Sequence, residues 1–296
     1  MGALEAELKV GVSYHTSSYC HSVLRVEPYT TCQLGCIYCY ARWYRPSGPP
    51  RAKPWLLRPL RKLWSKLVSR GLRLPPFRIS TLVDPLQPAE AREKLTLRIL
   101  ELALELGVPV ILNTKAVLFR EKPWRPLLEE LASEGLVVLQ VSVSSLGEAS
   151  RALEPGAPPG RERLEALSCL ADTVPCVLRL QPLIPGLFEV EAEELLEATL
   201  SSGVRHVVVE FLRETPEGLG ALYARLRSLG LDVWPGDALW MPYGPISHGL
   251  LRPRLAYRRR VLMALRERLA KSDVTVATCK EGLYDLQDGR DCCGFR

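Results

Sequence analysis

The feature that most limits the folds open to this chain is a regular alternation of short apolar runs and amphipathic segments between residues 77 and 229. The apolar runs are rich in β-branched residues and have the length of buried strands. The segments between them carry apolar residues at helical spacing. Strands are expected at 77–83, 108–113, 136–143, 176–180 and 204–211, and helices at 88–106, 123–134, 147–153, 161–172, 190–201 and 217–229.

Strands that alternate with helices predict parallel strands joined by right-handed helical crossovers. One further strand, at 22–26, precedes the others and gives about six β-α units, a number that suits a partial (β/α)6 barrel of the TIM type. This α/β barrel is expected over residues 22–230, with a basic insertion at about 42–76. An N-terminal extension would occupy 1–21, and a C-terminal extension 231–296, with a basic helix at 257–270.

The composition is that of a soluble globular protein, because 47% of the residues are hydrophobic and 24% are charged. No apolar run is long enough to span a bilayer, so no membrane partner is expected. The first eleven residues contain Glu5 and Glu7 and lack the apolar core of a signal peptide, which predicts a cytoplasmic location. Asn113 is the only asparagine, a depletion typical of thermophile proteins.

Positive charge is concentrated in one stretch of the chain. Residues 28–83 contain no acidic residue and eleven basic ones, so with a net charge of +6 the remainder carries 6 − 11 = −5. Tryptophans are interleaved with these basic residues, a combination that suits phosphate neutralisation and base stacking, although a solvated helix face has the same pattern. The candidate nucleic-acid contacts are Arg42, Arg45, Arg58, Arg61, Lys62 and Lys66.

The strongest chemical motif is a C-x3-C-x2-C run formed by Cys32, Cys36 and Cys39. Three thiolates on one short loop can hold a four-iron cluster and leave one iron open to another ligand. Zinc sites usually combine two separate C-x2-C pairs or histidines, and this run offers neither. The run follows the first expected strand, at the edge of a barrel where reactive groups lie, so we expect a catalytic [4Fe-4S] site there.

Several segments around this motif, taken in order, resemble the radical S-adenosylmethionine (AdoMet) superfamily and, within it, the branch related to spore photoproduct lyase. The resemblance covers roughly residues 20–215. The segments that carry it are Glu27-Pro28-Tyr29, the cysteine run with Tyr40-Ala41-Arg42, residues 80–90 (STLVDPLQPAE), Asn113-Thr114-Lys115, Ser142-Val143-Ser144, Leu153-Glu154-Pro155 and residues 182–186 (PLIPG).

This resemblance implies that AdoMet chelates the open iron and is cleaved, after reduction by a ferredoxin- or flavodoxin-like donor, to methionine and a 5′-deoxyadenosyl radical that abstracts hydrogen from a substrate. Tyr38 would pack near the adenine. Asp84, Lys115, Ser142 and Ser144 would meet the amino, carboxylate and ribose groups of AdoMet. Their place at a strand end favours a ligand role for the two serines, and the alternative is the simple alternation of a half-buried strand.

The sequence also departs from the resembled pattern. No cysteine occurs between Cys39 and Cys169, where photoproduct lyases carry a hydrogen-donating cysteine, and Gly156 stands where the Leu-Glu-Pro-Arg pattern has arginine. Reversal of the thymine photoproduct is therefore not the expected reaction. Cys169 and Cys176 are expected to be buried as small apolar residues.

The C-terminal cysteines Cys279, Cys292 and Cys293 form a second feature with three interpretations. They could hold an auxiliary iron–sulfur cluster, with Cys20 as a fourth ligand near His15 and His21. Cys292 or Cys293 could instead act as a catalytic thiol that donates hydrogen. A disulfide is the third interpretation, since thermophiles tolerate intracellular disulfides.

The sequence therefore predicts a radical AdoMet enzyme whose substrate is a nucleic acid, with RNA or DNA base modification or repair as the reaction. Two alternatives remain open at this stage. One is a radical AdoMet enzyme that acts on a peptide or a small anionic metabolite, and the other is a non-catalytic iron–sulfur electron carrier or nucleic-acid-binding module.

Overall fold

Seven parallel strands form one sheet, in the order β1-β2-β3-β4-β5-β6-β9, within the computed structural model, which describes residues 24–44, 46–244, 249–288 and 291–295. Every neighbouring pair in this sheet is parallel. The strands are β1 (Leu24–Val26), β2 (Phe77–Ile79), β3 (Val110–Thr114), β4 (Val137–Ser142), β5 (Cys176–Leu183), β6 (His206–Phe211) and β9 (Thr275–Thr278). The expected α/β fold with a parallel sheet is confirmed.

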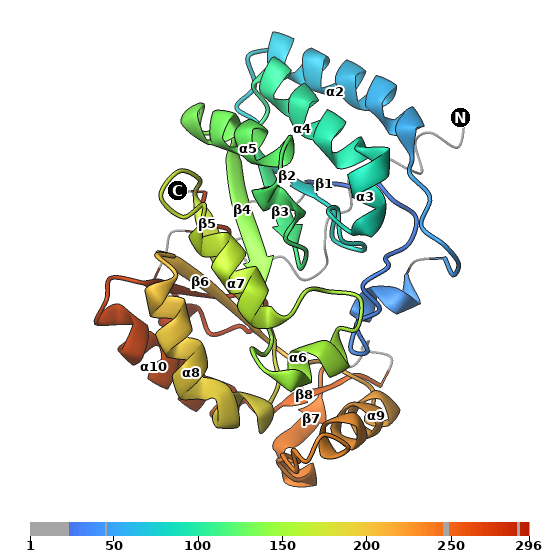
Figure 1. Ribbon diagram of the computed structural model, residues 1–296. Coiled ribbons are helices and arrows are strands. Elements are labelled where there is room, and N and C mark those ends of the chain that lie inside the picture. Colours follow the sequence, from blue (N-terminus) through green and yellow to red (C-terminus); the bar gives the residue numbers. More distant parts are fainter. Residues whose placement is uncertain (1–23, 45, 245–248, 289–290, 296) are drawn as a thin grey trace.

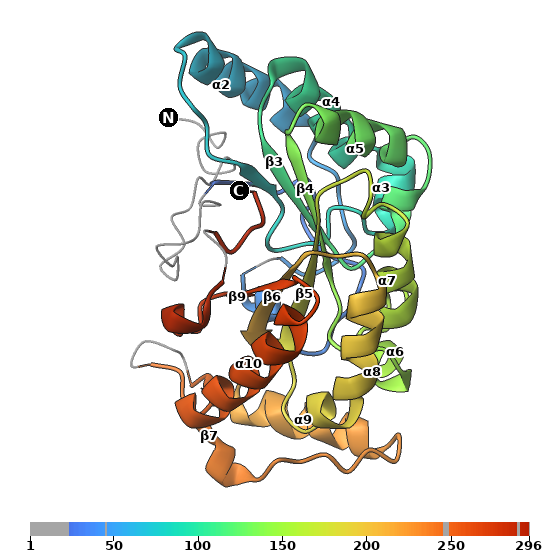
Figure 2. The same ribbon diagram turned by 90° about the vertical axis from the view of Figure 1, so that its left-hand side faces the viewer.

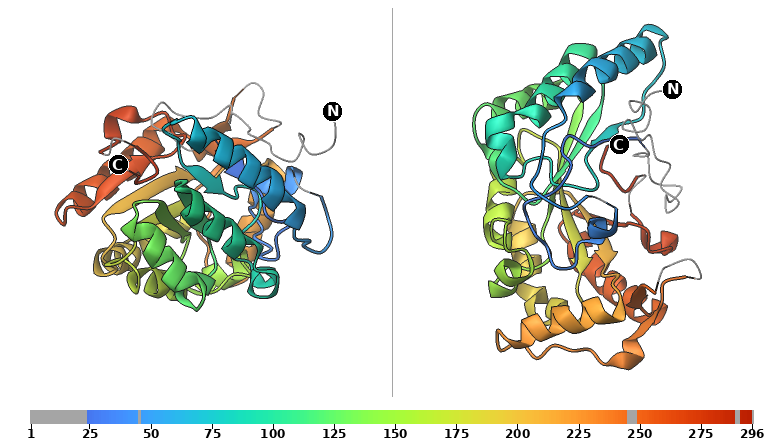
Figure 3. Two further views of the ribbon diagram at one scale, coloured as in Figure 1. Left: turned by 90° about the horizontal axis from the view of Figure 1, so that it is seen from above. Right: turned by 90° about the vertical axis from the view of Figure 1, so that its right-hand side faces the viewer.

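Helices cover the outer face of the sheet, as Figures 1 and 2 show. They are α2 (Leu57–Ser69), α3 (Pro88–Glu93), α4 (Leu95–Leu106), α5 (Trp124–Ser133), α6 (Glu148–Leu153), α7 (Gly160–Ser168), α8 (Leu187–Ser201), α9 (Pro216–Arg227) and α10 (Leu255–Ala270). Alternate strand residues such as Leu139 and Val141 pack under these helices in the main core. Helices α2 and α10 lie toward opposite edges of the sheet (Figure 3).

The C-terminal extension completes the sheet, which the sequence did not predict. Strand β9 pairs with β6 from His206↔Thr275 to Val209↔Thr278. A small antiparallel pair, β7 (Trp240–Pro242) and β8 (Leu251–Pro253), lies outside the sheet. The single helix expected at 88–106 is divided, because Lys94 adopts a left-handed conformation (φ 51°) between α3 and α4.

A second, smaller core joins the cysteine run to the rest of the molecule. Tyr38 packs there against apolar side chains of α6, α8 and α9 and against Trp240 of β7, and Cys36 touches the same cluster. The cysteine run therefore lies between the sheet and these helices. No helix in the described residues combines the length and the hydropathy needed to cross a membrane.

Candidate active site

The cysteine run lies in the loop after β1, at the carboxyl edge of the sheet, and α3 holds it in place. Gln87, which precedes α3, accepts a hydrogen bond from the Gln33 backbone N–H (2.8 Å) and donates one to the Thr31 carbonyl (2.9 Å). The Gln33 side chain in turn accepts from the Ala89 N–H (2.8 Å). Gln87 is fully buried, so this amide clamp fixes the loop from within the protein.

The segment after α6 closes over the other side of the loop. The Ile37 N–H donates to the Leu153 carbonyl and the Gly156 N–H donates to the Leu34 carbonyl, both at 2.9 Å. A Cβ atom on Gly156 would lie 2.4 Å from the Gln33 carbonyl oxygen. This close approach requires glycine at the position where the resembled pattern has arginine.

The three thiols of the run are partly exposed and free of disulfides. The Sγ atom of Cys32 accepts a hydrogen bond from the Asp84 N–H at 3.4 Å. The described residues contain no group of three or more Cys, His, Asp or Glu side chains arranged around a single metal ion. Ligands of a four-iron cluster bind different iron atoms and stand further apart, so three accessible thiols on one braced loop fit a cluster better than a single ion.

Asp84 follows β2 and braces the loops at this edge. Its carboxylate accepts from the Thr114 hydroxyl (2.7 Å) and from the backbone N–H groups of Lys115 (2.6 Å) and Leu86 (2.9 Å). Burial raises the pKa of Asp84, and these hydrogen bonds oppose the rise. Through these hydrogen bonds, the Asp84 carboxylate links the end of β2 to the end of β3, next to Cys32.

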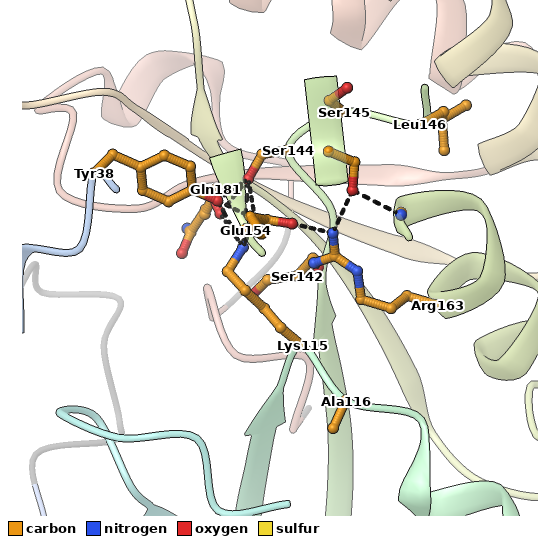
Figure 4. Close-up of polar contacts among 12 residues, drawn as sticks. Tyr38, Lys115, Ala116, Ser142, Ser144, Ser145, Leu146, Glu154, Arg163 and Gln181 are labelled. Atoms are coloured by element: carbon orange, nitrogen blue, oxygen red, sulfur yellow. Dashed lines mark hydrogen bonds and ion pairs between the residues drawn. The ribbon is translucent and has the colours of Figure 1, made fainter. Parts of the chain in front are cut away.

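Beside the loop, four polar side chains converge from different elements, as Figure 4 shows. The Lys115 ammonium lies 2.6 Å from a Glu154 carboxylate oxygen, 3.2 Å from the Tyr38 hydroxyl and 3.4 Å from the Ser144 hydroxyl. Tyr38 and Ser144 are 2.9 Å apart, and Tyr38 also donates to Glu154. Burial, together with the Glu154 charge, raises the pKa of Tyr38, which therefore remains a neutral phenol.

Glu154 is the charged centre of this group, although it is absent from the site residues predicted from the sequence. Its other oxygen pairs with Arg163 of α7, whose guanidinium also donates to the Ser142 carbonyl at 2.5 Å. Both side chains are almost fully buried. Burial alone would raise the pKa of Glu154, but Arg163 and Lys115 outweigh it and hold the pKa at about 2.

Glu154 belongs to one of the resembled segments and could have been predicted from it, whereas no sequence pattern points to Arg163. On an amphipathic helix, Arg163 looks like any surface arginine. Only the packing of α7 against β4 brings its guanidinium beneath the site.

The structure places the candidate nucleic-acid contacts in two groups. Arg42, at the end of the cysteine run, pairs with Glu214 and lies 4.8 Å over the exposed Trp43 ring. The other four described residues, Arg58, Arg61, Lys62 and Lys66, are exposed on α2, which packs on α4 at the outer face. Arg61 pairs with Glu105, and Arg45 lies outside the described residues.

The C-terminal cysteines meet on the concave side of the sheet. Cys292 and Cys293 are buried among Ile111, Val138 and Val177, with their sulfur atoms 3.8 Å apart. Cys279 follows β9 and contacts the same cluster. A hydrogen bond from Cys292 is the main cause that holds the pKa of Cys279 well below its usual value.

The three thiols do meet, and the auxiliary cluster stays a prediction. Cys20, His15 and His21 lie outside the described residues. The described cysteines form no disulfide. The prediction that Cys169 is buried is wrong: it is exposed at the end of α7, and Cys176 is only partly buried.

No protein-family model matches this chain, and no curated protein is found similar to it. Solved structures do resemble it. A spore photoproduct lyase variant with dinucleoside spore photoproduct has a TM-score of 0.67 at 16% identity, over 91% of this chain and 79% of that one. Another variant, with bound AdoMet and the same dinucleoside, gives 0.65 at 15%, over 94% and 85%.

SuiB from Streptococcus suis, bound to S-adenosylmethionine, is a more distant structural neighbour. Its TM-score is 0.52 at 13% identity, over 86% of this chain and 49% of that one. The chain thus has the fold of these AdoMet-binding proteins, and the resemblance to spore photoproduct lyase is confirmed at the level of the fold.

Proposed function

We propose that this protein is a radical AdoMet enzyme that acts on a nucleic acid. The observation that carries the proposal is the position of the cysteine run. Three accessible thiols stand at the carboxyl edge of a parallel sheet, directly beside the polar group of Tyr38, Lys115, Ser144 and Glu154. Reactive groups of such barrels lie at this edge.

Cys32, Cys36 and Cys39 would hold a [4Fe-4S] cluster, which, with AdoMet bound to it, supplies a 5′-deoxyadenosyl radical for hydrogen abstraction. Lys115, Ser142 and Ser144 would bind the polar groups of AdoMet, and Tyr38 would face its adenine. Glu154 orients the Lys115 ammonium through a 2.6 Å contact. Asp84, whose carboxylate is already engaged, would position the loop behind Cys32 rather than bind AdoMet.

Two observations support a nucleic-acid substrate. Trp43 and Tyr44, which follow the cysteine run, are 61% and 66% exposed, and Arg42 lies against Trp43. Exposed aromatic rings beside a guanidinium suit base stacking and phosphate contact. The similar spore photoproduct lyase also holds a dinucleoside in its structure.

The test is anaerobic reconstitution with iron and sulfide, followed by dithionite and AdoMet. The expected products are methionine and 5′-deoxyadenosine, with about four irons per chain. Cys36→Ala should abolish both products, and Cys169→Ala, the exposed cysteine of α7, should change neither. Absence of 5′-deoxyadenosine from a protein with a full cluster would overturn the enzymatic proposal in favour of an electron carrier.

The substrate class is tested by binding and turnover with RNA, DNA and a peptide extract. Binding to nucleic acid should weaken steeply as salt rises, because bound phosphates release counterions. Nucleic-acid binding without such a salt dependence, or turnover stimulated by peptide alone, would favour the peptide alternative. SuiB, for comparison, is seen bound to the precursor peptide SuiA.

A further inference from the structure

Two helices of the protein, α2 and α10, are strongly basic, but their cations have different surroundings. On α10, four arginines pair with carboxylates of neighbouring segments: Arg258 with Glu281, Arg259 with Asp285, Arg266 with Asp288 and Arg268 with Glu193. Most of the positive charge on α10 is therefore neutralised within the protein.

The cations of α2 and its flanking residues lack such partners. The chain has eight basic residues between positions 51 and 73 and no acidic residue there. Among the ion pairs of the described residues, only Arg61 of these eight takes part, with Glu105 of α4. Arg58, Lys62 and Lys66 are exposed and form no ion pair with any described residue. This surface therefore carries positive charge that the protein itself does not compensate.

Arg58, Lys62 and Lys66 form a basic stripe along α2, because residues four apart lie on the same side of a helix. From the first residue to the last, the stripe spans about 12 Å. Like charges at this spacing repel each other, and α2 has no acidic residue in its first turn to complement the helix dipole. The basic stripe thus works against the stability of its own helix, and a bound polyanion would remove that repulsion.

The opposite face of α2 is already occupied. Leu60 and Trp64 are fully buried in the main core, and α2 packs on α4. The helix therefore cannot insert this apolar face into a lipid surface, as membrane-binding amphipathic helices do. A repeating anion along the basic stripe fits better, since about 12 Å corresponds to three or four phosphates of one nucleic-acid strand.

The segment that leads into α2 is tied to the cysteine run. The Thr30 N–H donates to the Arg51 carbonyl (3.1 Å), and the Lys53 N–H donates to the Pro28 carbonyl (3.0 Å). Pro28 and Thr30 directly precede the cysteine run. Trp55, at the start of the helical segment, is 46% exposed and offers a ring for base stacking. Backbone hydrogen bonds therefore fix this segment relative to the proposed active site.

We propose that Arg58, Lys62 and Lys66 form a docking surface, on the outer face of the protein, for the phosphate backbone of the nucleic-acid substrate. Contacts of this kind bind RNA and DNA without reading their sequence. Arg61, which pairs with Glu105, is not part of this surface. The inference rests on the proposed function, since it says where the substrate backbone binds. Its test measures binding and not AdoMet cleavage, so the two proposals can fail separately.

The test is titration of the reconstituted protein with a labelled DNA oligonucleotide and, separately, with an RNA of the same sequence, over a range of salt concentrations. The stripe variant combines Arg58→Gln, Lys62→Gln and Lys66→Gln. Its slope of log K against log salt should be shallower than that of the wild type by about 2–3, because each lost phosphate contact removes about 0.7–0.9. Its melting temperature should not fall, since repulsion along α2 is relieved.

The matched control combines Arg259→Gln, Arg266→Gln and Arg268→Gln on α10. These substitutions change the net charge by the same amount but remove cations that are already paired. The control should retain the wild-type slope. A stripe variant with the wild-type slope, or a control that loses as much, would overturn the docking surface and leave the proposed function standing.

Two outcomes with the wild-type protein also decide the inference. Tighter binding to anionic lipid vesicles than to either oligonucleotide would overturn the docking surface in favour of a membrane contact. Absence of salt-dependent binding to both oligonucleotides would contradict the substrate class of the proposed function, and the docking surface with it.

Discussion

The buried carboxylate of Glu154 shows how one residue organises the candidate site. It balances the Lys115 ammonium beside the cysteine run and the buried Arg163 guanidinium of α7, and it accepts a hydrogen bond from Tyr38. Two cations share one anion, so removal of that anion leaves two positive charges inside the protein. Such a loss costs far more than the loss of an exposed pair.

Glu154→Gln should therefore lower the free energy of unfolding by about 3–5 kcal/mol. Glu148→Gln is the matched control, because Glu148 is 77% exposed and pairs with Arg151 on the surface of α6. The control should cost less than about 1 kcal/mol. Urea denaturation of both variants at neutral pH gives the comparison, and equal costs would contradict the central role of Glu154.

The same carboxylate predicts a pH dependence. Its pKa falls from an ordinary 4.5 to about 2 in the folded protein. Between these values the unfolded chain binds more protons than the folded one, so stability rises with pH there. The contribution is complete above pH 4.5 and lost as the pH falls toward 2, and the urea midpoint of Glu154→Gln should change less with pH over this window.

At the scale of elements, the main role of the short helix α3 is to hold the cysteine run in place. Helix α3 begins directly after Gln87. In its first turn, the Ala89 N–H donates to the Gln33 side chain of the cysteine run. Glu90, in the same turn, contacts the start of α4. Glu90 accepts from the Thr96 and Leu97 N–H groups, both at 2.9 Å, and so caps the start of α4. The left-handed Lys94 makes this second helix start possible.

Gln87→Ala should loosen the run, because the Gln33 N–H and the Thr31 carbonyl lose their partner. We expect several-fold faster loss of the cluster to an iron chelator, followed by visible absorbance, and a stability cost of about 1–3 kcal/mol. Arg92→Gln, on the exposed face of the same helix, should retain the wild-type rate. Equal rates in the two variants would show that the clamp does not hold the loop.

At the scale of the whole molecule, the C-terminal segment 291–295 packs against the concave face of the sheet. Figure 2 shows it on the side of the sheet away from the helices. The buried Asp291 carboxylate accepts from the Cys293 N–H (2.9 Å) and the Phe295 N–H (3.1 Å), and Gly294 lies against Val177 and His206. The segment therefore lies against the amino ends of β5 and β6.

Gly294→Ala should disturb the packing of this segment against the sheet. Gly294 has a φ of 73°, and an added Cβ would lie 2.6 Å from a Val177 methyl group. We expect a loss of about 1–3 kcal/mol and faster alkylation of Cys292 and Cys293.

Gly220→Ala is the control for this change, because Gly220 lies inside α9 with open space around it and should gain about 0.5–1 kcal/mol. Chemical denaturation and mass spectrometry of the alkylated peptides measure both effects. Slow alkylation in Gly294→Ala, as in the wild type, would contradict this expectation.

The sequence by itself determined the parallel α/β fold and the place of the cysteine run, because strand and helix periodicity and ligand spacing are local patterns. It also identified Tyr38, Lys115 and Ser144, which the structure brings together. The tertiary structure alone decided that β9 completes the sheet, that Glu154 pairs with a buried Arg163, and that Arg78 and Arg179 converge inside the barrel. These features depend on contacts between residues far apart in the chain, and an arginine that faces a barrel has the same local pattern as one that faces water.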